Sequence, residues 1–121
     1  MTTREALTAA IASLLDRSGI AGDDDPLAAR TKLLRLLEAE NCHGEAHSPE
    51  DCPLGVWFRR ETGLRILLTS SRSSSRVVAT GGRVMGVLER CVMDLPTCVA
   101  DAVREVDAER VQWLLSAKEA A

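Results

Sequence analysis

Hydrophobic residues recur at three- and four-residue intervals in the first segment of the chain, which is the spacing of one face of an α-helix. The stripe consists of Leu7, Ile11, Leu14 and Leu15. Thr2 precedes it and Glu5 follows Thr2 by three residues, which is the spacing of a capping box. Gly19 is a typical helix stop. The pattern therefore predicts a helix between Thr2 and Gly19.

A second helix is predicted after Asp25-Pro26, because Asp is a favoured N-cap and Pro fits the first turn. Its leucines cover about half of the helix circumference. They are Leu27, Leu33, Leu34, Leu36 and Leu37. An apolar face of that width contacts more than one neighbour, so this helix is expected near the centre of a bundle.

The next apolar positions, Leu54, Trp57 and Phe58, fall on the inner side of a third helix, for which Ser48 is the predicted cap. Thr62-Gly63 interrupts this helix. The segment from Leu64 to Leu68 fits either a short strand or a buried helical turn, and its pattern does not choose between them.

A fourth helix is predicted from about Ser75 to Met93, where eight residues fall on one helical stripe. They are Val77, Val78, Gly81, Val84, Met85, Leu88, Cys91 and Val92. Asp94-Leu95-Pro96 is a break. A last helix follows, with Val99, Ala102, Val103 and Val106 on one side and a change of register near Asp107.

Composition favours the same fold class. Aromatic residues make up 2% of the 121 residues, so the core must be built from Leu, Val, Ala and Met, which suits packed helices better than a β-sandwich. We therefore predict an all-α fold of four to five helices in an antiparallel bundle, as one domain over residues 1–121. Neither a membrane span nor a secretory signal is apparent, which favours a cytoplasmic protein with free or metal-binding cysteines.

Candidate chemistry is concentrated in one loop. Cys42, His43, His47 and Cys52 lie within eleven residues, in a chain with four Cys and two His in all. Thiolate and imidazole are the ligands that zinc prefers. Zinc is therefore the possible cofactor, although the spacing matches no standard finger. The alternative is a polar loop in which Cys52 packs as a small hydrophobic residue.

Cys52, Leu54, Gly55, Trp57 and Phe58 together resemble the signature of the chemoreceptor zinc-binding family. The resemblance is tight over seven residues, and a looser match of helix order and length extends over about 90 residues. It implies a four-helix bundle, often dimeric, found in bacterial chemoreceptors and diguanylate cyclases. It also implies that Cys52 is a zinc ligand and that Leu54, Gly55 and Trp57 are structural.

The remaining ligands of that family have no counterpart in this sequence. The family supplies one His from an earlier helix and two His, four residues apart, from a later helix. Here the segment 26–40 has no His, and Ser75 or Arg76 and Ala79 or Thr80 fall where the His pair is expected. The resemblance thus implies that the family's metal site is lost, unless Cys42, His43 and His47 replace it.

Charge is unevenly distributed along the chain. Residues 1–58 carry a net charge of −5, residues 59–90 carry +5 and residues 91–121 carry −3, which sum to −3. Arg76, Arg83 and Arg90 recur every seven residues, nearly opposite the apolar stripe of the predicted fourth helix, and Arg72 precedes them. Such a face binds an acidic partner or pairs with the chain's own acidic helices.

No catalytic constellation or phosphate-binding loop is apparent, so we expect a non-enzymatic role. The prediction is a small cytosolic regulatory protein, of the anti-activator or adaptor type, that binds another protein such as a transcription or signalling regulator. Arg72, Arg76, Arg83 and Arg90 are the expected contact residues, and homodimerisation is expected. The alternative is a zinc or thiol sensor, and a weaker alternative is a nucleic-acid accessory protein. The acidic chain and the lack of stacking aromatics disfavour nucleic acid.

Overall fold

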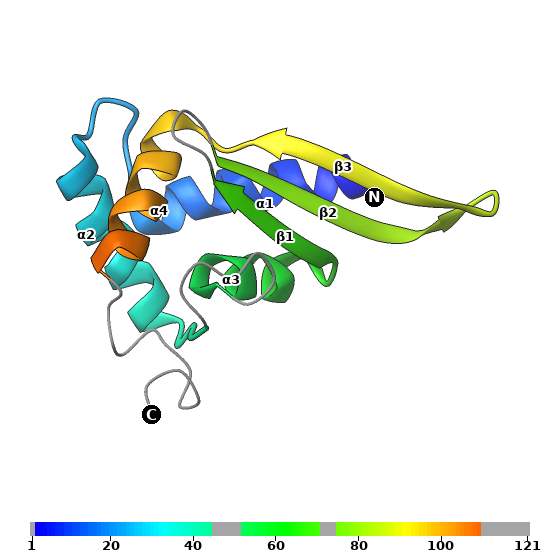
Figure 1. Ribbon diagram of the computed structural model, residues 1–121, viewed down its shortest axis with the longest axis horizontal. Helices are drawn as coiled ribbons and strands as arrows, with labels where there is room; N and C mark the ends of the chain where they lie inside the picture. The colour runs from blue at the N-terminus through cyan, green and yellow to red at the C-terminus, as the bar shows by residue number, and fades with distance from the viewer. Residues whose placement is uncertain (1, 45–51, 71–74, 110–121) are drawn as a thin grey trace.

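The computed structural model describes residues 2–44, 52–70 and 75–109, and these form a mixed α/β fold (Figure 1). These residues comprise four helices and a three-stranded antiparallel sheet. The elements are α1 (Thr3–Ser18), α2 (Pro26–Ala39), α3 (Pro53–Thr62), β1 (Arg65–Ser70), β2 (Ser75–Val84), β3 (Val87–Asp94) and α4 (Thr97–Glu109). The prediction of an all-α helical bundle is therefore wrong, and with it the four-helix bundle implied by the family resemblance.

The first two helices begin where the sequence indicates. The Thr2 hydroxyl accepts a hydrogen bond from the backbone N–H of Glu5 at 3.1 Å, and Gly19 ends α1 in the left-handed conformation with φ 75°. The Asp25 carboxylate accepts from the N–H of Ala28 at 2.8 Å, and Pro26 occupies the first turn of α2. These caps are confirmed because they depend on local chemistry alone.

The third helix begins at Pro53, and Cys52 is its N-cap, with Sγ accepting from the N–H of Gly55 at 3.3 Å. The predicted cap, Ser48, lies outside the described residues. Gly63 ends the helix with φ 70°, which confirms the predicted interruption. The ambiguous segment after it forms β1.

The segment predicted as a fourth helix is instead the β2–β3 hairpin. Val84 pairs with Val87 across a two-residue turn formed by Met85 and Gly86, with φ of 52° and 80°. Positive φ at both positions is the signature of a tight hairpin turn whose twist matches the strands. Valine and glycine, which recur in this segment, both disfavour a helix interior. Backbone pairing of β2 with β1 stabilises the extended conformation instead.

The strands lie in the order β1-β2-β3, and the sheet has one packed face. We call this the inner face; it carries Ile66, Leu68, Val77, Ala79 and Cys91, all buried. Helix α1 lies against β2 and β3, and α3 lies against β1. Helices α2 and α4 pack on each other at one end of the molecule, while the β2–β3 hairpin extends beyond the helices at the other (Figure 1).

Trp57 and Phe58 are the largest fully buried side chains of the core, and their rings meet edge to face at 5.3 Å. Trp57 is 1% exposed, which confirms that it is a core residue. Within the described ranges, no helix has the length and apolar character needed to cross a membrane.

Candidate functional site

The residues of the Cys/His loop have separate structural roles. Cys42 is fully buried beyond the end of α2, and Cys52 is buried at the start of α3. His43 is exposed, and its Nε2 lies 2.7 Å from the Asn41 side-chain oxygen. His47 lies outside the described residues. Within those residues, no group of three or more Cys, His, Asp or Glu side chains is arranged to hold a metal ion.

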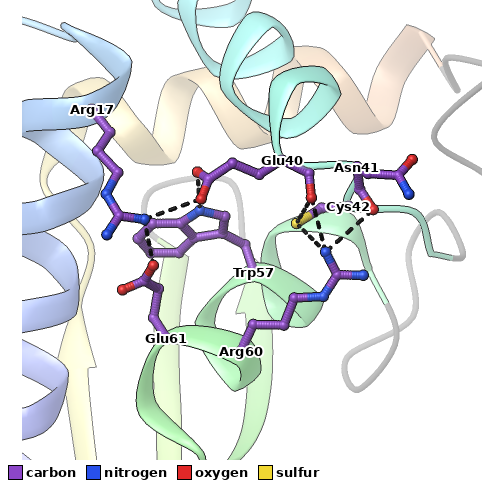
Figure 2. A network of polar contacts seen from close by, with 7 residues as sticks. All are labelled: Arg17, Glu40, Asn41, Cys42, Trp57, Arg60 and Glu61. Atoms are coloured by element: carbon purple, nitrogen blue, oxygen red, sulfur yellow. Dashed lines mark hydrogen bonds and ion pairs between the residues drawn. The ribbon is translucent and has the colours of Figure 1, made fainter.

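Cys42 belongs to a polar junction between α1, α2 and α3 (Figure 2). The Arg60 guanidinium donates to the backbone oxygens of Glu40 at 2.9 Å and Asn41 at 3.3 Å, and lies 3.5 Å from the Cys42 sulfur. Arg60 thus covers carbonyl groups at the C-terminal end of α2 that have no helical partner.

The same junction ties α1 to the other two helices. Arg17 contacts the Glu40 carboxylate at 3.0 Å and the Glu61 carboxylate at 2.5 Å, and Glu40 accepts from the Trp57 indole N–H at 2.8 Å (Figure 2). The hydrogen bond and charge of Glu61 raise the pKa of Arg17. The contacts of Arg17, Glu40 and Arg60 described here are all with other residues of the chain, so we interpret this junction as structural.

Burial raises the pKa of the Cys42 thiol, and the nearby Arg60 guanidinium opposes this effect only in part. A thiol is nucleophilic and binds metal as the thiolate. The fully buried, protonated Cys42 is therefore a poor reactive group. All four cysteines of the chain are free and buried.

The predicted arginine contacts are placed differently from the expectation. Arg76 on β2 and Arg90 on β3 point to the sheet face that faces away from α1 and α3, which we call the outer face. Arg83 lies in β2, where its side chain is not described, and Arg72 lies outside the described residues. The helix on which these residues were expected to align does not exist; instead, strand alternation brings Arg76 and Arg90 to one side.

The pairing of the strands arranges the outer face in three rows that cross the sheet. One row is Arg65, Thr80 and Arg90; the middle row is Leu67, Val78 and Val92; the third is Thr69, Arg76 and Asp94. Arg76 donates to the Asp94 carboxylate at 2.9 Å. The apolar middle row therefore crosses the face between two charged rows. Together these two rows contain three arginines and one aspartate.

The middle row does not belong to the hydrophobic core. Val78 is 8% exposed, yet it is separate from the cluster that α1 and α3 cover. Val92 is 48% exposed, and Leu88, two residues before Arg90 on β3, is 53% exposed. Solvated outer faces of antiparallel sheets usually carry polar side chains, so apolar residues here point to an interface.

Sequence reasoning did not single out Arg65 or Leu67, and it placed Val78 and Val92 on a helical stripe instead of in a row across a sheet. In the sequence, Arg65, Leu67 and Thr69 alternate with Ile66 and Leu68, which are buried in the structure. A segment this short fits either a strand or a helical turn, so the alternation alone did not identify a strand. The rows themselves arise only from register between strands.

Comparison with known proteins adds no relative. No family model matches the chain, and neither a curated protein nor a solved structure matches it.

Proposed function

We propose that the protein is a small non-enzymatic regulator that binds another protein through the outer face of its sheet. The observation that supports this is the apolar row between two arginine-bearing rows, in which Val78 is buried, Leu67 is half-buried and Val92 is 48% exposed. Large apolar patches with polar rims are typical of protein interfaces, and arginine is enriched at interface hot spots.

The chemistry of the outer face favours a partner segment with an apolar side chain flanked by carboxylates. Leu67 and Val92 offer contact area on either side of the buried Val78. Arg90 offers a planar guanidinium group that suits a carboxylate, in the row that it shares with Arg65, and Arg76, which already pairs with Asp94, lies in the row on the other side. A signalling or transcription regulator with an acidic, amphipathic segment has this chemistry. The proposal places the protein in the cytoplasm, where four free, buried thiols persist without oxidation.

Nucleic acid is the weaker candidate for the outer face. A phosphate backbone is best followed by an unbroken track of positive charge, whereas the apolar row separates the arginines here. The described residues of this face include no aromatic side chain on which a base would stack.

Zinc or thiol sensing through Cys52, Cys42, His43 and His47 stays an alternative prediction. For metal binding, Cys52 would have to give up the cap of α3, and Cys42 would have to leave its contact with Arg60. Elemental analysis of the purified protein tests this alternative directly. One zinc per chain, removed by Cys52→Ala, would support it.

The outer face is tested with Arg65→Glu/Arg76→Glu, which reverses charge on β1 and β2 and leaves β3 unchanged. Arg35→Glu is the matched control, because Arg35 is exposed on α2. The partner is first isolated from the native host with the wild-type protein as bait and then purified. In direct titration, the double variant is expected to bind at least about tenfold more weakly, because like charges across an interface repel.

Arg35→Glu is expected to leave the affinity within about twofold of wild type. Equal binding by the wild type and the double variant would place the interface elsewhere. Retention of nucleic acid with a steep salt dependence would favour the accessory-protein alternative. Melting temperature is measured for each variant, so that lost binding is separated from lost folding.

A further inference from the structure

Strand β3 is one of the two edge strands of the sheet, and its outer edge is paired with no other strand among the described residues. β3 runs over eight residues, Val87–Asp94, and pairs with β2 on one side only. Among the described residues, α1 is the other element that contacts it closely, and this contact is to the inner face of the sheet. Long, exposed edge strands are templates for pairing with another strand.

Backbone geometry shows which residues offer hydrogen bonds at this edge. The N–H of Leu95 donates to the carbonyl of Ser75 at 2.9 Å, so Leu95 and its alternate neighbours on β3 bond to β2. The residues between them, Arg90, Val92 and Asp94, therefore direct their N–H and C=O groups away from the sheet. Their side chains lie on the outer face.

We propose that β3 pairs antiparallel with β3 of a second copy of this chain, with the two Val92 residues opposite each other on the dyad. In this register Arg90 lies opposite Asp94 of the second copy, and Asp94 lies opposite its Arg90. Arg90, Val92 and Asp94, whose backbone groups point away from the sheet, would all be hydrogen-bonded to the second copy in this register. Self-complementarity of this kind is what a two-fold interface requires.

The charges on β3 favour a dyad at Val92 over a dyad at any neighbouring residue. A dyad at Arg90 or at Asp94 opposes like charges, and a dyad at Cys91 or Met93 sets a charged residue opposite Val92. Only the dyad at Val92 matches Arg with Asp on both sides. On the inner face it also sets Cys91 opposite Met93 of the second copy, so apolar residues meet there as well.

The pairing would cover exposed side chains and extend the outer face. Val92, 48% exposed in one copy, would pack against its equivalent. Asp94, which already accepts from Arg76, would lie between two guanidinium groups. The middle row would then continue across the dyad into the same row of the second copy. This inference rests on the backbone groups and the charges at the edge of the sheet, whereas the proposed function rests on the whole outer face, with which the edge shares Arg90 and Val92.

The first test is the mass in solution by light scattering and sedimentation equilibrium. The wild type is expected at twice the chain mass of 13.1 kDa at micromolar concentration. Arg90→Asp sets two carboxylates opposite each other and is expected to raise the dimer dissociation constant at least about tenfold. The exchange Arg90→Asp/Asp94→Arg restores opposite charges and is expected to recover most of the affinity.

Val92→Pro gives a backbone test. The Val92 N–H points away from β2, so proline removes no hydrogen bond within the chain but removes one at the dyad. This variant is expected to be monomeric with unchanged circular dichroism. A monomeric wild type, or an Arg90→Asp variant that dimerises as tightly as wild type, would overturn the proposal.

A cross-link fixes the register even if the proline variant does not fold. Across a hydrogen-bonded pair the two Cα atoms lie about 5.5 Å apart, within reach of a disulfide. Val92→Cys is therefore expected to form a dimer on mild oxidation. Two copies of Arg90→Cys would lie about 13 Å apart along the strands and are expected to stay unlinked. Equal cross-linking of both variants would contradict the register.

The two proposals fail separately. Arg65 lies on β1, two strands from the proposed dyad, so Arg65→Glu is expected to weaken partner binding and leave the dimer mass unchanged. A monomeric wild type whose partner binding Arg65→Glu weakens would overturn the dimer alone, and a dimeric wild type whose partner binding Arg65→Glu leaves unchanged would overturn the partner site alone.

Discussion

The two faces of the sheet are made from the same three strands, yet they differ in what covers their apolar side chains. The inner face is covered by α1 and α3, and its residues belong to the core. The outer face carries an apolar row that no described helix covers. Burial by the chain itself explains the first face, while the second is the face that we propose for a partner. The comparison predicts that substitutions on the inner side alter folding, and substitutions on the outer side alter binding.

The largest effect is expected beneath the inner face. Trp57→Ala removes the largest buried ring and the indole that donates to Glu40, and is expected to lower the free energy of unfolding by about 3–5 kcal/mol. Denaturant unfolding measures this. A loss below about 1 kcal/mol would mean that the ring is not packed as described. Trp57→Phe separates the lost hydrogen bond from the lost volume.

A smaller effect is expected where β2 approaches the start of α1. A Cβ atom at Gly81 would lie 2.4 Å from the Thr3 hydroxyl, which is itself buried. Gly81→Ala is expected to cost about 1–3 kcal/mol, the range for overpacking. Gly22→Ala is the matched control, because a Cβ there meets nothing within 4 Å. Equal stability of the two variants would show that Thr3 simply rotates away.

The turn of the hairpin belongs to neither face. Met85 is 98% exposed and has φ 52°, a conformation that Asn adopts more readily than Met. Met85→Asn is therefore expected to stabilise the protein by about 0.5–1 kcal/mol through backbone preference alone. Thermal unfolding checks the sign. Destabilisation would mean that the Met85 side chain makes contacts that this exposure does not indicate.

The contact of Glu89 with α1 predicts a weak pH dependence. The hydroxyl and backbone N–H of Thr3 lower the pKa of the Glu89 carboxyl. A carboxyl whose pKa is lower in the folded state contributes stability above its unfolded pKa of about 4.3, and this contribution is lost as the pH falls through the folded pKa. Glu89→Gln is expected to be less stable at pH 7 and to lose less on acidification. Parallel curves of stability against pH would contradict this.

Local sequence is sufficient to predict where α1 and α2 begin and where α1 and α3 end. Two helices begin at residues whose side chains accept a backbone hydrogen bond three residues later, Thr2 and Asp25. Two helices end at glycines that adopt positive φ, Gly19 and Gly63. Both effects act within a few residues, so they can be recognised in the sequence. The burial of Trp57 likewise followed from its position on an amphipathic helix.

The conformation of the segment from Ser75 to Asp94 depends on tertiary contacts that the sequence pattern does not reveal. Its apolar residues fit a helical stripe as well as two strands, and the choice depends on pairing with β1, which lies earlier in the chain. Met85-Gly86 between two valines was the local signal for a hairpin. The row of Arg65 and Arg90, the row of Arg76 and the apolar row between them follow from strand register, since residues far apart in sequence become neighbours only when strands pair.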